Sequence, residues 1–247
     1  MDLQTFFAQN PRAAIAFSGG ADSAFLLWAA VTAGADVCAY YVQSEFQPAF
    51  ERRDAERLAR EVGARLRVLE VSALCAPGVR ENPPERCYFC KKAIFAAIAA
   101  AAREDGYTLL LDGTNASDDA ADRPGMRALR ELSVRSPLRE CALTKAEIRE
   151  ASRAAGLFTW DKPAYACLAT RIPAGEVITP EKLAATERAE DYLFSLGFTD
   201  FRVRYLSGTA KIQLPTAQWA KLAEHRAEIL NYLRQDYTAV TLDLEVR

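Results

Sequence analysis

The sequence lacks any apolar run of about 18 residues, the length that suggests a membrane-spanning helix. Its first residues, Met1, Asp2, Leu3 and Gln4, also lack the charged-then-apolar order of a secretory signal peptide. From these two absences we expect a cytoplasmic protein with no membrane partner.

Long runs of lysine or arginine are missing as well. The chain has 31 Lys and Arg against 33 Asp and Glu, a formal net charge of −2, whereas a nucleic-acid-binding domain usually carries a basic face. We therefore expect a small-molecule partner in preference to nucleic acid. Half of the 247 residues are hydrophobic, which suits one large globular domain with or without a small second one.

A glycine turn stands between the first apolar run and the first helical pattern. Residues 13–17 are apolar, residues 18–23 are Ser-Gly-Gly-Ala-Asp-Ser, and residues 24–30 have helical spacing. The first N–H groups of a helix lack acceptors within the helix and lie at the positive end of its dipole. The turn therefore predicts an anion site, with phosphate as the expected ligand. The Walker and dinucleotide-binding glycine patterns are both absent. In the alternative interpretation, the glycines only turn the chain and Asp22 or Ser23 caps the helix.

Strand and helix signals alternate through the N-terminal half. Strands are expected over 36–42, 65–71 and 107–111, and helices over 48–63 and 90–104. This alternation predicts an α/β fold with a doubly wound parallel sheet, in which ligands collect at the carboxyl ends of the strands. The turn at 18–23 lies at one such end, and the polar segment with Gly113, Thr114 and Asn115 lies at another. We expect both to face one crevice, although a solvated turn explains the second equally well.

Residues 160–175 have no helical or strand period and contain two prolines, so they are expected to form a loop near a domain boundary. We expect a first domain over 1–172 and a small C-terminal α+β domain over 173–247. The second domain is expected to contain a helix over 179–197, a hairpin over 201–206 and 209–214, a helix over 216–235 and a strand over 239–246. In the first domain, the capping box Thr144-Lys145-Ala146-Glu147 predicts a helix that ends at Gly156.

Six cysteines are present, and Cys87 and Cys90 have the C-x-x-C spacing at the start of a helix, where the dipole favours thiolates. A closed zinc site needs four ligands, whereas three cysteines can hold a [4Fe-4S] cluster with one iron left open. Cys167, in the loop 160–175, is the natural third ligand, and a pair of partly buried thiols at Cys87 and Cys90 is the alternative. The other cysteines are Cys38, expected in the core of a strand, and Cys75 and Cys141, which have no assigned role.

The segment 18–23 resembles the SGGxDS loop of the PP-loop ATP pyrophosphatases, which split ATP between its α and β phosphates and adenylate a substrate. The resemblance implies a site that binds ATP and pyrophosphate, in which Asp22 helps to place Mg²⁺. Its residues would be Ser18, Gly19, Gly20, Asp22, Ser23, Gly113, Thr114 and Asn115.

Further segments are similar to the LarE family and extend the resemblance over nearly the whole chain. They are Asp112-Gly113-Thr114-Asn115, Arg123-Pro124-Gly125, residues 134–138, Thr144-Lys145, Trp160-Asp161-Lys162-Pro163 and residues 166–171. LarE proteins are sulfur insertases of nickel-pincer nucleotide biosynthesis. The resemblance implies that the chain uses ATP and Mg²⁺ to adenylate a carboxylate of pyridinium-3,5-biscarboxylic acid mononucleotide, converts it to a thiocarboxylate, and self-associates as a homo-oligomer.

The family has two sulfur sources. In one branch, the cysteine that matches Cys167 gives up its own sulfur and becomes dehydroalanine; in the other, cysteines that match Cys87, Cys90 and Cys167 hold a [4Fe-4S] cluster that relays sulfide. All three are present, which favours the cluster and leaves the sacrificial route as the first alternative. A PP-loop tRNA thiolase is the second alternative, which the acidic balance disfavours.

Arginines are the expected donors to the phosphate and carboxylates of such a substrate. The candidates are Arg123, Arg171, Arg202 and Arg204. The acidic residues Glu187 and Glu190 are candidates for holding a cation, with Glu190 as a second Mg²⁺ ligand beside Asp22. In the alternative interpretation, Arg202 and Arg204 lie on the solvated face of a hairpin.

Overall fold

The computed structural model describes residues 1–118 and 124–245. The chain divides into a larger unit, Met1–Val79 with Glu85–Tyr165, and a smaller unit, Arg80–Pro84 with Ala166–Arg247. The division therefore falls between 165 and 166 where the sequence suggested 172 and 173, and it adds 80–84 to the smaller unit. The short segment belongs there because the Asn82 side-chain amide donates to the carbonyl oxygens of Ile172 and Pro173, at 3.2 and 2.7 Å.

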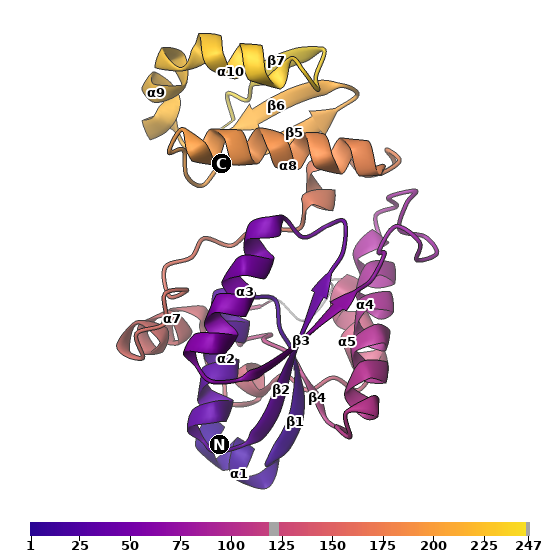
Figure 1. Cartoon of the computed structure of the whole chain (residues 1–247), viewed down its shortest axis with the longest axis vertical. Helices are drawn as coiled ribbons and strands as arrows, with labels where there is room; N and C mark the ends of the chain where they lie inside the picture. The colour runs from indigo at the N-terminus through magenta and orange to yellow at the C-terminus, as the bar shows by residue number, and fades with distance from the viewer. Residues whose placement is uncertain (119–123, 246–247) are drawn as a thin grey trace. The chain divides into compact units, whose positions relative to one another are not determined.

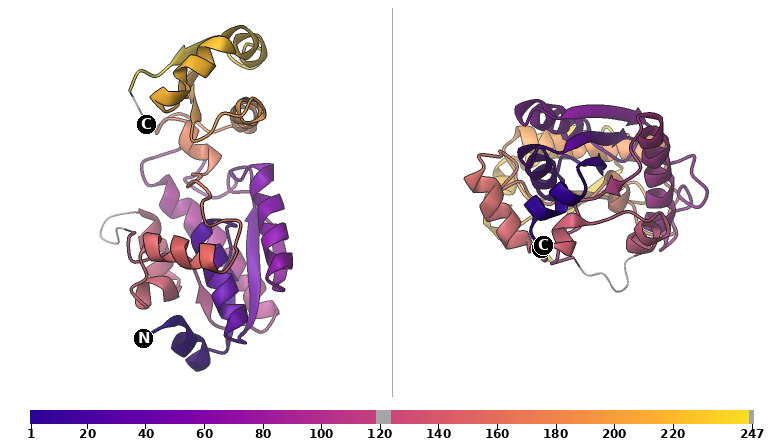
Figure 2. Two further views of the ribbon diagram at one scale, coloured as in Figure 1. Left: turned by 90° about the vertical axis from the view of Figure 1, so that its left-hand side faces the viewer. Right: turned by 90° about the horizontal axis from the view of Figure 1, so that it is seen from below.

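A four-stranded parallel sheet forms the centre of the larger unit, in the order β3-β2-β1-β4. Its strands are β1 (Arg12–Ala16), β2 (Asp36–Gln43), β3 (Arg65–Glu70) and β4 (Leu110–Leu111). The helices of the unit are α1 (Leu3–Gln9), α2 (Ala21–Thr32), α3 (Ala49–Glu61), α4 (Arg86–Glu104), α5 (Pro124–Glu131), α6 (Pro137–Glu140) and α7 (Lys145–Ala154). Figure 1 shows α2 and α3 on one side of the sheet and α4 and α5 on the other, and Figure 2 shows the unit from two further directions.

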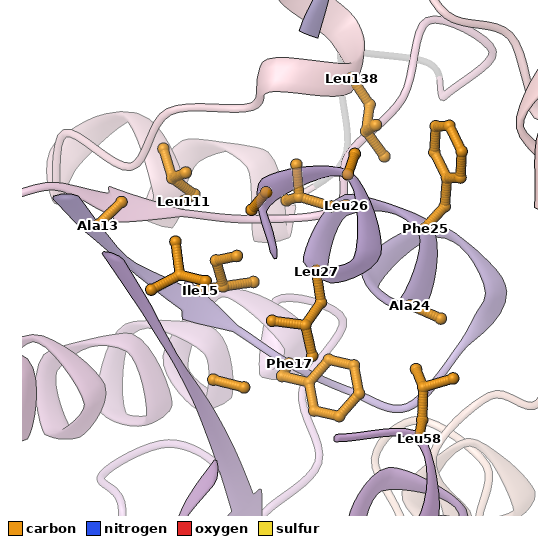
Figure 3. Packing of buried hydrophobic residues seen from close by; sticks show 14 of the residues in the cluster. Ala13, Ile15, Phe17, Ala24, Phe25, Leu26, Leu27, Leu58, Leu111 and Leu138 are labelled. Atoms are coloured by element: carbon orange, nitrogen blue, oxygen red, sulfur yellow. The ribbon is translucent and has the colours of Figure 1, made fainter. Parts of the chain in front are cut away.

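Both faces of this sheet are buried, as the predicted doubly wound fold requires. Because successive side chains of a strand point to opposite faces, Ile15 and Tyr41 belong to the cluster that includes α2, whereas Ala14 and Tyr40 belong to the cluster that includes α4. Figure 3 shows the first cluster, in which Leu27 of α2 packs with the sheet residues. The expected α/β class is confirmed.

The fourth strand is much shorter than the expected 107–111. The N–H of Tyr107 donates to the carbonyl of Ala102 at 2.8 Å and so closes the end of α4, with Gly106 at φ +81°. Because its N–H is used by the helix end, Tyr107 cannot join the strand ladder. The residues paired with β1 are Leu110 and Leu111, and the Leu109 carbonyl accepts from the N–H of Ala14 at 2.8 Å.

The smaller unit has a three-stranded mixed sheet in the order β5-β6-β7, in which β5 and β6 form the expected hairpin. Val203, Ala210 and Ile212 of this sheet pack in one cluster with residues of α8 and α10, which gives the expected α+β arrangement. The predicted helix over 216–235 is interrupted, because the chain leaves helical dihedrals at His225, where ψ is 7°. The elements are η1 (Leu168–Arg171), α8 (Pro180–Ser195), β5 (Arg202–Leu206), β6 (Thr209–Gln213), η2 (Thr216–Gln218), α9 (Trp219–Glu224), α10 (Arg226–Leu233) and β7 (Ala239–Leu242).

Among the described residues, no helix combines the length and the apolar character needed to cross a bilayer.

Candidate functional site

The turn between β1 and α2 is held by its own hydroxyl groups. The Ser18 and Ser23 Oγ atoms lie 3.1 Å apart, and Ser23 Oγ donates to the carbonyl of Gly20 at 3.1 Å. Gly19 has φ +72°, and a Cβ there would stand 3.2 Å from Cβ of Ala55 on α3. Gly20 is the N-cap, and no side chain in the described part of the molecule caps α2, so neither Asp22 nor Ser23 takes the capping role considered for it. The first-turn amides of α2 are thus left to an outside acceptor, as an anion site requires.

The polar segment after β4 lies directly against this turn. A Cβ on Gly113 would stand 2.9 Å from the main-chain nitrogen of Ser23, so only a glycine permits this approach without a shift. The buried Asp112 carboxylate braces the segment by accepting from the Ser136 hydroxyl at 2.6 Å and from the N–H of Thr114 at 3.3 Å. Residues 113–115 therefore share one edge of the sheet with the turn; their role in ATP binding stays a prediction.

Two lysines contact the turn. Lys145 Nζ donates to Asp22 Oδ2 at 2.6 Å, and Lys162 Nζ donates to the Gly19 carbonyl at 3.3 Å and to Asp54 Oδ2 at 2.7 Å. Neither lysine is assigned a role from the sequence, although both lie in segments that carry the LarE resemblance. Spacing along the chain gives no sign that either cation reaches the turn.

Lys145 is positioned by the helix that it begins. The predicted capping box is confirmed: the N–H of Glu147 donates to Thr144 Oγ1, and Glu147 Oε2 accepts from the N–H of Thr144 at 2.8 Å. The Thr144 hydroxyl also donates to Glu147 Oε2 at 2.6 Å, and the bonds that this carboxylate accepts from the Thr144 hydroxyl and N–H lower the pKa of Glu147. The cap fixes the first turn of α7 and therefore the direction from which Lys145 reaches Asp22.

Asp22 has the character of a cation ligand. Its Oδ2 accepts from Lys145, whereas its Oδ1 is buried and has no hydrogen-bond partner among the described residues. A buried carboxylate oxygen without a donor is costly, and oxygen ligands of this kind are those that Mg²⁺ prefers. The predicted Mg²⁺ position therefore fits this residue.

Cys87 and Cys90 lie at the start of α4, three residues apart and hence on one helix face. Cys87 is exposed and Cys90 is buried. The guanidinium of Arg86, itself 7% exposed, donates to Cys87 Sγ at 3.7 Å. Two cysteines separated by two residues have the spacing that metal-binding cysteine pairs use.

Cys167 belongs to the smaller unit, where it is partly exposed and directly precedes η1. Three thiolates are the right donor type for an iron-sulfur cluster, and the described residues contain no group of three or more His, Cys, Asp or Glu side chains positioned to hold a metal ion. The cluster therefore stays a prediction. Cys38 lies in the core as expected, and burial raises its pKa.

Arg171 and Glu190 form a buried ion pair. Both side chains are 1% exposed, and Arg171 donates from Nε and Nη2 to the two Glu190 oxygens at 2.8 and 2.9 Å. Glu190 Oε1 also accepts from the N–H of Val203 at 2.9 Å. A substrate at Arg171 or Mg²⁺ at Glu190 would have to displace these bonds, so the geometry favours a shared structural role, and the predicted binding roles stay predictions.

The hairpin arginines are less solvated than the alternative interpretation supposed. Arg202 is 6% exposed and donates to the carbonyl of Phe201 at 2.6 Å. Arg204 donates to Gln213 Oε1 at 2.6 Å and to the carbonyl of Thr170 at 2.8 Å, three residues after Cys167. Arg123 lies outside the described residues, and Glu187 lies on α8.

Comparison with known proteins gives relatives along almost the whole chain, while no family model matches it. An uncharacterized protein of Synechocystis sp. is 37% identical over 248 residues, 99% of this chain and 92% of the relative. The pyridinium-3,5-bisthiocarboxylic acid mononucleotide synthase of Lactiplantibacillus plantarum is 33% identical over 236 residues, 94% of this chain and 86% of the relative. An uncharacterized protein of Methanocaldococcus jannaschii is 27% identical over 239 residues, 96% of this chain and 91% of the relative.

Proposed function

The chain belongs to the LarE family of pyridinium-3,5-bisthiocarboxylic acid mononucleotide synthases, and we propose that it is an ATP-dependent sulfur insertase. Its substrate would be pyridinium-3,5-biscarboxylic acid mononucleotide, one carboxylate of which it adenylates and converts to a thiocarboxylate. The observation that supports this most is the close approach of Gly113 to Ser23 of the turn 18–23. Beside it lies the Asp22 carboxylate, whose Oδ1 has no hydrogen-bond partner among the described residues.

The first step activates the carboxylate. A carboxylate oxygen attacks the α-phosphorus of ATP, the bond from that phosphorus to the bridging oxygen breaks, and pyrophosphate leaves. The N–H groups of the turn, with Ser18 and Ser23, would receive the charge that develops on the departing pyrophosphate. Asp22 would hold Mg²⁺, which offsets further phosphate charge when bound.

The second step replaces oxygen by sulfur. Sulfide attacks the acyl carbon, AMP leaves with the original carboxylate oxygen, and the product is a thiocarboxylate. We propose that Cys87, Cys90 and Cys167 hold a [4Fe-4S] cluster, which would supply the sulfide when bound. Arg202 and Arg204, the second of which contacts the Thr170 carbonyl close to Cys167 in the chain, would orient the phosphate and the second carboxylate of the substrate.

The alternative sulfur source is Cys167 itself. Its thiolate would displace AMP from the acyl carbon to give a thioester; loss of the Cα proton and cleavage of the Cβ–S bond would then leave dehydroalanine in the chain and the sulfur on the product. Each protein molecule would act once.

Cysteine variants separate the two routes. With anaerobic protein, ATP, Mg²⁺, sulfide and the dicarboxylate mononucleotide, we expect several thiocarboxylates per wild-type chain, and for Cys87→Ala and Cys90→Ala we expect loss of the iron chromophore and of turnover while ATP still binds. Cys75→Ala, at an exposed cysteine outside this set, is the matched control and should keep both. A Cys87→Ala protein that completes one transfer and carries dehydroalanine at position 167 would establish the sacrificial route.

A further inference from the structure

The turn 18–23 has acidic neighbours that an incoming triphosphate must tolerate. Asp22 lies in the turn, and Asp54 forms an ion pair with Lys162, which also contacts the turn. The side chains of Asp22 and Asp54 are both only partly exposed. Adding phosphate oxygens beside these carboxylates is repulsive unless cations balance the charge. Of the described side chains, Lys145 and Lys162 are the cationic ones that hydrogen bond to residues of the turn.

The two lysines are held differently. Lys162 is 15% exposed and has two acceptors, one of them the Gly19 carbonyl inside the turn. Lys145 is 34% exposed, and within the described part of the chain its ammonium group donates to one atom, Asp22 Oδ2. A single partly exposed ion pair contributes little to stability, so Lys145 can change partners at small cost, whereas a move of Lys162 would also release the carbonyl of Gly19.

We propose that Lys145 and Lys162 bind the phosphates of ATP, and that Lys145 does so by exchanging Asp22 for a phosphate oxygen. The inference rests on the proposed function in taking the turn 18–23 as the triphosphate site. Without ligand, Lys145 neutralises Asp22. When a cation takes over the Asp22 carboxylate, whose Oδ1 already lacks a donor among the described residues, the ammonium group of Lys145 becomes available to the phosphate. Lys162 stays on Asp54 and holds Gly19 in its left-handed conformation.

This exchange predicts an unusual effect of removing a carboxylate. Asp22→Asn should free Lys145 even without metal, and metal-free pyrophosphate should then bind about tenfold more tightly than to wild type, the effect of one additional charge-assisted hydrogen bond. In a Lys145→Met background the same Asp22→Asn change should alter affinity by less than about threefold, because no ammonium group is released. Lys162→Met should weaken pyrophosphate binding equally in wild type and in Asp22→Asn. Lys162 pairs with Asp54, so the Asp22→Asn change does not alter its availability.

The measurement is titration calorimetry of pyrophosphate in EDTA with wild type, Asp22→Asn, Lys145→Met and the double variant, and with Lys162→Met alone and combined with Asp22→Asn. Lys182→Met is the matched control, since Lys182 is a half-buried lysine of the smaller unit paired with Glu176 at 2.8 Å, and it should bind as wild type does. An equal gain from Asp22→Asn with and without Lys145 would reduce the effect to lost repulsion and overturn the exchange while leaving the proposed function intact. Wild type that binds neither pyrophosphate nor Mg·ATP would overturn both.

Discussion

Gly113 approaches Ser23 so closely that a methyl group at position 113 would stand 2.9 Å from the Ser23 main-chain nitrogen and 3.1 Å from its Cα. The contact joins the loop after β4 to the first turn of α2, where the unpaired helix amides lie. Since neither contact atom belongs to a flexible side chain, any residue larger than glycine must displace backbone.

Gly113→Ala should therefore impair nucleotide binding more than folding. We expect the affinity for Mg·ATP to fall by at least about tenfold, because a displacement of the first turn disturbs the donors of the anion site. Titration calorimetry measures this. Gly34→Ala is the control: a Cβ at position 34 would have no described heavy atom within 4 Å, but φ is +76°, so it should lose about 1–2 kcal/mol of unfolding free energy and bind ATP normally. Equal ATP affinity for Gly113→Ala and wild type would contradict the claim that the contact between Gly113 and Ser23 shapes the nucleotide site.

Breaking the ion pair of Arg171 and Glu190 should destabilise the chain. Arg171→Met leaves the Glu190 carboxylate buried without its partner, so we expect a loss of about 3–5 kcal/mol in the free energy of unfolding. Glu190→Leu together with Arg171→Met removes both charges and should recover most of that loss. Urea unfolding of Arg171→Met, of Glu190→Leu and of the double variant gives these values. Single variants of full stability that fail to bind substrate or Mg²⁺ would instead support the binding roles inferred from sequence.

Acid should weaken the larger unit through Asp105. Its Oδ2 accepts from the Tyr40 hydroxyl at 2.6 Å and from Arg67 at 2.9 Å, and these bonds lower its pKa below the ordinary 3.8. A carboxyl group with a lowered folded-state pKa stabilises fully above its unfolded pKa and loses that contribution as pH falls through the folded value. Asp105→Asn should therefore be less stable than wild type at about pH 6, and the difference should shrink at about pH 3. Urea midpoints that differ equally at both pH values would contradict this.

The sheet was predictable from the sequence because each strand has its own local apolar run. The turn at 18–23 and the capping box at Thr144 could also be recognised, since both depend on neighbouring residues in the chain. The start of β4 could not be predicted, because the run 107–111 gives no sign that the Tyr107 N–H closes the end of α4 instead of joining the strand ladder.

The contacts of the site depend on residues far apart in the chain. Lys145 reaches Asp22 only after α7 packs on α2, and Lys162 reaches Gly19 only after the loop that follows α7 approaches the turn. In sequence, an arginine that faces a ligand cannot be told from one that faces a buried acid. The bonds of Arg171 to Glu190 were therefore not predictable, and its role in substrate binding stays a prediction.

The products of ATP test the central claim most directly. Incubated with Mg·ATP, the protein should form AMP and pyrophosphate in equal amounts only when pyridinium-3,5-biscarboxylic acid mononucleotide is present, because the carboxylate is the group that attacks the α-phosphorus. Phosphorus NMR distinguishes these products from ADP and orthophosphate. Formation of ADP and orthophosphate, or of AMP and pyrophosphate at the same rate without the carboxylate acceptor, would contradict the account.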